Sequence, residues 1–175
     1  MATKDLDFAR LSLRDALDFA ILVEEEARER YEEFAQQMES HHTPLAARFF
    51  AFMARNEEKH RAELAGRRTA LFGQAPSTVR REMLFDVEAP EYAEARVFMT
   101  AHDALTTALR SEEKAWTFFS QALPSIKQPE VKALFEELLQ EEVEHQVLVK
   151  VELSKLPPED SYKQEDFEDD PVGHD

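Results

Sequence analysis

The chain has 175 residues, a formal net charge of -16 at pH 7, only three glycines and no cysteine. The lack of cysteine excludes disulfides, zinc ribbons, cysteine-ligated iron–sulfur clusters and thiol catalysis, and three glycines are too few for phosphate-cradling loops or dinucleotide fingerprints. The excess of acidic residues disfavours nucleic acid and anionic membranes as partners.

The first half of the chain predicts two helices joined by a short turn. The first helix runs from about residue 12 to residue 40 and starts with the capping pair Ser12 and Asp15. The second starts at Thr43-Pro44, a pair typical of an N-cap and a first helical residue, and ends near residues 66 to 68.

The second half predicts two more helices after a long connection. Residues 71 to 90 are interrupted by glycine and proline and are long enough to cross a bundle. The third helix runs from about Pro90 to Leu123, and the fourth runs from Pro129 to before Pro157. Two short turns on either side of one long connection predict an all-α antiparallel four-helix bundle with a long crossover between helices 2 and 3.

Apolar residues recur along each helix at alternating steps of three and four, which places them on one face. We call each such line of residues a seam, and we expect the four seams to face a common core. Polar residues interrupt all four. The seams are Leu17, Ala20, Glu24, Ala27, Tyr31, Phe34 and Met38; Ala46, Phe50, Met53, Glu57, His60 and Leu64; Leu105, Ala108, Glu112, Ala115, Phe119 and Ala122; and Val131, Phe135, Leu138, Glu142, His145 and Val149.

Four glutamates and two histidines therefore share one predicted interior. A buried carboxylate without a counter-charge costs roughly several kcal/mol of desolvation, and no Lys or Arg lies on a seam. Two divalent or trivalent cations would supply the missing charge, and carboxylate oxygen with imidazole nitrogen suits iron or manganese. The candidate metal residues are Glu24, Glu57, His60, Glu112, Glu142 and His145.

The two halves of the chain repeat one helical hairpin. Glu24 and Glu112 occupy matching places in the first helix of each half, and two Glu-x-x-His pairs occupy matching places in the second. At about 1.5 Å rise per residue, the polar residues of each hairpin meet at one height. This repetition favours a metal site over an apolar seam that tolerates stray polar groups.

The stretch from Glu24 to Tyr31, followed by Glu57-Glu58-Lys59-His60 and repeated in the second half, resembles the diiron domain of rubrerythrins and the wider ferritin-like superfamily. The resemblance covers about residues 11 to 153. It implies a ferritin-like four-helix domain, which we place at residues 1 to 156. The acidic segment beyond it, residues 157 to 175, is expected to be a disordered tail.

By this resemblance the six candidate residues would be the ligands of two iron ions. The same six would be the catalytic residues, and manganese is the alternative metal. Glu57 and Glu142 would bridge the ions. The chain departs from rubrerythrins because it lacks their rubredoxin-like iron site, and because Ala115 stands where they carry a further ligand carboxylate for peroxidase chemistry. Phe119 stands in the second half where the first half has Tyr31.

The resemblance predicts a non-haem diiron oxidoreductase that reduces peroxide or O₂ as Fe(II) is oxidised, in oxidative-stress defence or iron handling. Peroxidase turnover would need a separate electron-donor protein, because the chain has no cysteine-ligated redox centre. Two alternatives stay open. One is a ferroxidase or iron-storage protein, and the other is a metal-stabilised helical interaction module without catalysis.

The remaining polar and aromatic residues receive simpler interpretations. Glu141 and the other acids beside the seams are interpreted as a solvated face, and His102 as a structural or surface residue. Tyr31 is either plain core or a hydrogen-bond donor or redox group beside the metals. A homodimer is predicted from four aromatic residues that widen the apolar stripe: Phe49, Phe52, Trp116 and Phe118.

The first ten residues contain no apolar signal core, and no uncharged run reaches membrane-spanning length. We therefore expect a soluble cytoplasmic protein.

Overall fold

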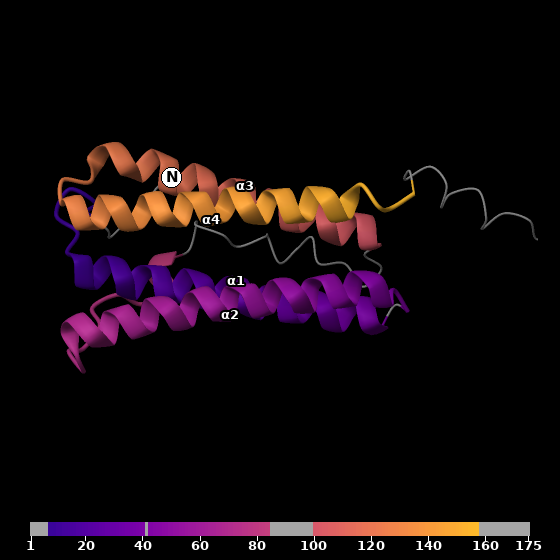
Figure 1. Cartoon of the computed structure of the whole chain (residues 1–175), viewed down its shortest axis with the longest axis horizontal. Coiled ribbons are helices and arrows are strands. Elements are labelled where there is room, and N and C mark those ends of the chain that lie inside the picture. Colours follow the sequence, from indigo (N-terminus) through magenta and orange to yellow (C-terminus); the bar gives the residue numbers. More distant parts are fainter. Residues whose placement is uncertain (1–6, 41, 85–99, 158–175) are drawn as a thin grey trace, which may run out of the picture.

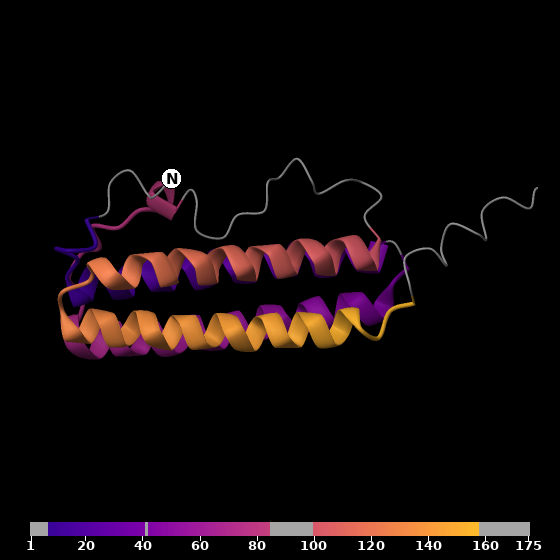
Figure 2. The ribbon, with the colours of Figure 1, turned by 90° about the horizontal axis from the view of Figure 1, so that it is seen from above.

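The computed structural model describes residues 7–40, 42–84 and 100–157. Within these ranges it contains no strand, and its four α-helices are α1 (Leu13–Ser40), α2 (Pro44–Phe72), α3 (Ala101–Ala122) and α4 (Pro129–Leu153). The α1–α2 hairpin lies along the α3–α4 hairpin (Figures 1 and 2). The predicted all-α four-helix bundle is confirmed. Two short 3₁₀ helices, η1 (Arg81–Leu84) and η2 (Leu123–Ser125), were not predicted.

The helices begin largely where their capping residues predict. The backbone N–H of Asp15 donates to Ser12 Oγ at 3.2 Å, and Ser12 Oγ donates to Asp15 Oδ2 at 2.6 Å, so this pair caps α1. Thr43 precedes Pro44 at the start of α2, as expected. Proline also starts α4. Proline is tolerated there, because the backbone N–H that it lacks would have no hydrogen-bond partner within the first turn of a helix.

Two predicted boundaries are wrong. α2 continues past residues 66 to 68, because one glycine inside a helix costs only about 1 kcal/mol, and it ends at Phe72. The capping residue is Gly73, whose φ of 56° favours glycine. α3 begins at Ala101 and not near Pro90. Thr100 is extended and accepts a hydrogen bond from the backbone of Asp103, which caps the helix there; residues 90–99 lie outside the described part.

The connection between α2 and α3 joins opposite ends of the bundle. Figure 1 shows α2 ending at one end of the bundle and α3 beginning at the other. The described part of this crossover returns along α1, where Thr78 Oγ1 donates to Asp15 Oδ1 at 2.7 Å and Arg81 donates to Glu29 at 3.0 Å. The predicted long crossover is therefore present.

All predicted seam residues are buried except His60, which is half-buried. The apolar ones divide into two clusters. One contains Phe19, Phe119 and Phe135, and the other contains Phe34 and Phe50. Each fully buried side chain of this size contributes roughly 1.5–3 kcal/mol of hydrophobic stabilisation. Every helix passes through both clusters, and the polar seam residues lie between them.

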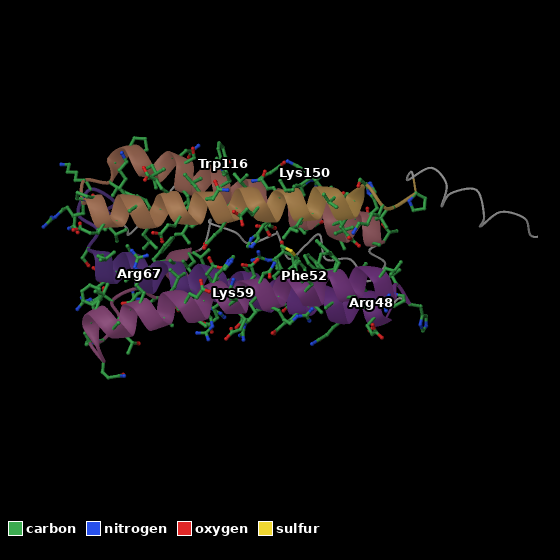
Figure 3. All side chains as sticks on the ribbon, in the orientation of Figure 1. Arg48, Phe52, Lys59, Arg67, Trp116 and Lys150 are labelled. Carbon is green, nitrogen blue, oxygen red and sulfur yellow. The ribbon has the colours of Figure 1, made fainter. Side chains whose placement is uncertain are left out.

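The four aromatic residues predicted to form a dimer surface do not form one exposed face. Phe49 packs against one apolar cluster and Phe118 against the other. Phe52 and Trp116 are each 40% exposed, but they lie on different hairpins, apart from one another (Figure 3). The homodimer stays a prediction.

The described helices include none with the length and apolar content that crossing a membrane requires. The predicted acidic tail lies outside the described residues, apart from Pro157.

Candidate metal centre

Six polar side chains from all four helices lie at one height between the two apolar clusters. The five most buried are Glu57 and Glu112, each 1% exposed, Glu24 at 4%, and Glu142 and His145 at 5%. The sixth, His60, is half-buried. The structure thus brings together every candidate metal residue predicted from the sequence, and we call this group the polar belt.

The local sequence explains why these residues point inward. Each glutamate stands at a seam position, so helix formation alone turns it toward the core once its apolar seam neighbours are buried. One turn after Glu24 lies Ala27, and one turn after Glu112 lies Ala115; both alanines are buried. Small side chains beside the glutamates leave space for the carboxylates within the bundle.

His145 lies between two helices of the belt. Its Nδ1 is 3.3 Å from Glu57 Oε1 and 3.4 Å from Glu112 Oε2. His60 Nδ1 is 3.9 Å from Glu24 Oε2. The rings of His60 and His145 stack, with centroids 5.4 Å apart and planes inclined by 12°. The two histidines therefore face one another from α2 and α4, each beside a different glutamate.

Tyr31 is part of this arrangement. Its hydroxyl donates a hydrogen bond to Glu112 Oε1, and its ring stacks on Phe50 at 6.0 Å between centroids. The sequence leaves three roles open for Tyr31: core residue, hydrogen-bond donor or redox group. The structure shows the second, because the Tyr31 hydroxyl donates to Glu112, a candidate ligand. The bond fixes one oxygen of Glu112.

The potential ligand atoms form three overlapping groups, within each of which they lie no more than 4.8 Å apart. One group is Glu112, Glu142 and His145, and a second is Glu57, His60 and His145. The third consists of Glu24, His60 and Glu141. The centre therefore has two ends, which Glu57 and the two histidines connect.

Burial controls the charge of the belt when no metal is bound. Burial raises the pKa of Glu24 to about 8, an effect that the charges of Glu141 and Glu112 reinforce and a hydrogen bond with Glu57 opposes. Burial also lowers the pKa of His60, and the charge of His145 adds to this. A proton on Glu24 and a neutral His60 are therefore favoured near neutral pH.

Glu112 behaves differently from Glu24 although both are buried. Burial alone would raise the pKa of Glu112, but hydrogen bonds and charge from His145, with the Tyr31 hydrogen bond, outweigh burial and lower that pKa. The α3 end of the belt is thus arranged to hold an ionised carboxylate.

Glu141 is the site residue that the sequence reasoning missed. Helical periodicity assigns Glu141 to a solvated face, because it lies beside the α4 seam. In the structure Glu141 is only partly exposed, and its carboxylate lies within 4.8 Å of the potential ligand atoms of Glu24 and His60. Burial raises the pKa of Glu141 to about 7. No signal in α4 itself identifies it, since its neighbours there are equally acidic. His102, in contrast, lies 3.5 Å from Thr106 Oγ1 on its own helix and does not join the belt.

The donor set fits two metal ions. Buried carboxylates and imidazoles from four helices supply oxygen and nitrogen ligands of the kind that iron and manganese accept. His60 Nδ1 is buried and has no hydrogen-bond partner within the described part of the chain. A buried polar atom without a partner costs free energy, which a bound cation would offset.

Comparisons with known proteins agree with this geometry. Residues 15–146 match the rubrerythrin family. A solved structure of an uncharacterised conserved protein from Magnetospirillum magnetotacticum MS-1 is 31% identical, has a TM-score of 0.68, and covers 84% of this chain and 97% of its own. A comparison with curated proteins finds no match.

Proposed function

The chain belongs to the rubrerythrin family, and from that membership we propose that it is a non-haem diiron oxidoreductase that reduces peroxide. The observation that carries the proposal is the polar belt, in which four buried glutamates, the buried His145 and the half-buried His60 lie at one height on four helices. An apolar bundle gains nothing from such a belt, because moving ionisable groups from water into the core costs desolvation free energy.

The belt residues divide between two iron ions. Glu24 and His60 would hold one ion, and Glu112, Glu142 and His145 the other, with Glu57 between them. When bound, the iron ions would supply electrons and open positions for reducing peroxide or O₂. Bridging of the ions by Glu57 and Glu142, as the resemblance implies, stays a prediction, as does iron over manganese.

The chain itself supplies position, a dry interior and a proton-bearing group. The two apolar clusters above and below the belt exclude water along the bundle axis. Tyr31 fixes Glu112 Oε1 by its hydrogen bond, so Oε2 is the oxygen that faces His145. The Tyr31 hydroxyl also holds a proton next to a carboxylate within the site.

The overall reaction would be H₂O₂ + 2 e⁻ + 2 H⁺ → 2 H₂O, for which bound Fe(II) would supply the electrons and solvent the protons. Return to Fe(II) needs an external reductant, and a separate electron-donor protein of low potential would supply it. Ferroxidase activity is the second candidate, favoured by an acidic groove that reaches His60 from the surface.

The two candidates differ in the oxidant they use and in how much iron they oxidise. Protein loaded anaerobically with two Fe(II) per chain is mixed in a stopped-flow instrument with H₂O₂ or with O₂. A peroxidase oxidises its iron faster with H₂O₂ and consumes one H₂O₂ per two Fe(II). A ferroxidase uses O₂ well and continues to oxidise Fe(II) added beyond two per chain.

The control is the Glu57→Ala variant under the same conditions. If wild-type protein oxidises Fe(II) no faster than this variant or than buffer, with either oxidant, the proposed activity is wrong and the metal-stabilised interaction module becomes the better interpretation.

A further inference from the structure

A surface groove of about 610 Å³ lies between α2 and α4, beside the polar belt. Lys59, labelled in Figure 3, lies on its α2 side. The groove lining is acidic, with one cation, Lys59, and five glutamates: Glu63, Glu136, Glu137, Glu141 and Glu144. Lys59 pairs with Glu63, and Lys132 and Arg67 pair with Glu136 and Glu137, so Glu141 and Glu144 are the lining carboxylates outside these three ion pairs.

Two groove residues also belong to the buried centre. His60 and Glu141 line the groove, and both lie within 4.8 Å of a carboxylate oxygen of Glu24 through their potential ligand atoms. Glu24 itself is 4% exposed and is not part of the groove lining. His60 and Glu141 therefore connect the protein surface with one end of the belt.

The two ends of the centre are unequal without Glu141. The α3–α4 end has two carboxylates and one imidazole, from Glu112, Glu142 and His145. The other end has one carboxylate, Glu24, and one imidazole, His60, besides the central Glu57. With Glu141 included, each end has two carboxylates and one imidazole.

The surroundings of His60 also suggest a cation at this end. His60 Nδ1 is buried and has no hydrogen-bond partner within the described residues, and it is the ring atom nearest to Glu24 Oε2. A groove lined mainly by carboxylates raises the local concentration of cations at its surface. A cation that moves inward from the groove reaches Glu141 and His60 before Glu24.

We propose that Glu141 is a further metal ligand, which completes the Glu24/His60 end of the centre and receives divalent cations from the groove. This inference rests on the proposed diiron function and adds a residue that lies outside the repeated Glu and Glu-x-x-His pattern. The role requires the Glu141 carboxylate itself and not merely a negative charge in the groove.

The test is metal binding to the apo protein, with Co(II) as the probe. Co(II) accepts the same oxygen and nitrogen ligands as Fe(II), stays divalent in air, and reports its coordination through visible absorption. Co(II) is titrated into wild-type protein, Glu141→Gln and Glu144→Gln. Glu144 is the matched control, because it lies on the same helix, lines the same groove and loses a carboxylate by the same substitution, but does not belong to the ligand group.

Wild-type protein should bind two Co(II) ions per chain. Glu141→Gln should weaken one of the two binding steps by about tenfold or more and change the visible spectrum of that step. Glu144→Gln should leave both dissociation constants within about threefold and both spectra unchanged, as expected for an exposed charge. Circular dichroism of the apo variants verifies that each is folded.

Equal effects of Glu141→Gln and Glu144→Gln on affinity and spectrum would overturn the inference, since Glu141 would then act only as a groove charge. A Glu57→Ala titration separates this failure from a failure of the proposed function. If Glu57→Ala loses Co(II) while Glu141→Gln matches the control, the diiron proposal stands without Glu141. If wild-type protein does not bind two Co(II), both proposals fail.

Discussion

Tyr31 on α1 donates a hydrogen bond to Glu112 on α3, so this contact joins the two hairpins at the height of the polar belt, as does the approach of His145 to Glu57. The matching position in the second half is Phe119, which lies in an apolar cluster and has no hydroxyl. The two hairpins repeat one pattern of glutamate and histidine positions, but this hydrogen bond acts only on the end of the centre that contains Glu112.

Replacing Tyr31 with Phe tests that contact. The aromatic ring still packs on Phe50, so the fold should survive with a loss of about 1 kcal/mol in the free energy of unfolding. Metal content should stay near two ions per chain, while the rate of Fe(II) oxidation falls by about tenfold because Glu112 is no longer held. Metal analysis and stopped-flow absorbance measure the two quantities. An unchanged oxidation rate would show that the hydrogen bond is only structural.

Replacing Glu57 with Ala should lower the metal content below two ions per chain, because Glu57 lies at the centre of the ligand groups. The neighbouring variant Glu58→Ala is the control. Glu58 is half-buried, pairs with Arg61 at 2.7 Å and lies outside these groups, so its loss should leave the metal content unchanged. Elemental analysis after dialysis gives both numbers, and full occupancy in Glu57→Ala would refute the assignment.

The stability of the apo protein should fall as pH rises from 6.5 to 8. Burial raises the pKa of Glu24 to about 8 and that of Glu141 to about 7, from 4.5. Stability from these protonated carboxyl groups is complete below pH 4.5 and is lost as pH rises through the folded pKa values. His60 has a lowered pKa and acts in the opposite sense, but only below pH 6.5.

Between pH 6.5 and 8 the carboxyl groups of Glu24 and Glu141 therefore dominate the pH dependence of stability. Glu24 alone can contribute a slope of up to about 1.4 kcal/mol per pH unit, equivalent to a fall of a few degrees in Tm across the window. Thermal unfolding of the apo wild type and of Glu24→Gln at several pH values measures this dependence, and the Tm of the variant should change less with pH. Bound metal should reverse the trend, since its ligands must be deprotonated. A flat wild-type curve without metal would mean that Glu24 is ionised in the folded apo protein.

Removal of residues 159–175 should leave metal content and Fe(II) oxidation unchanged. Among the residues that the structure describes, every candidate ligand group and both apolar clusters are formed by residues up to Leu156. The truncated protein should unfold at the same temperature as the full chain. A folded truncation that binds less metal or oxidises Fe(II) more slowly would show that the tail acts on the site.

Much of this site could be predicted from helical periodicity. The angle between successive residues on a helix is a local property, so the seams identified the inward faces and the six belt residues without knowledge of the packing. The repetition of Glu24 and Glu57 by Glu112 and Glu142 indicated a common height, and the structure places these glutamates between the same two apolar clusters. The capping pair Ser12 and Asp15 likewise followed from local chemistry.

The helix ends were less predictable. Gly66 resembles a stop signal, but a helix stabilised by tertiary contacts tolerates one glycine. The side chain of Arg68, at the predicted end of α2, donates to Asp18 Oδ1 on α1 at 2.8 Å and to the Gly73 carbonyl at 2.8 Å. These partners lie on another helix and in the crossover, so the sequence of α2 alone does not determine where the helix ends.

Glu141 shows most clearly what the tertiary structure decided. On α4 it is one of several acids beside the seam, and periodicity assigns all of them to solvent. Its proximity to His60 and Glu24 depends on how α4 is rotated and offset against α1 and α2. Rotation and offset are set by side chains packing across helices, not by any one helix, so the sequence alone determined the inward-facing belt residues, and the packing decided which outward-facing carboxylate meets them.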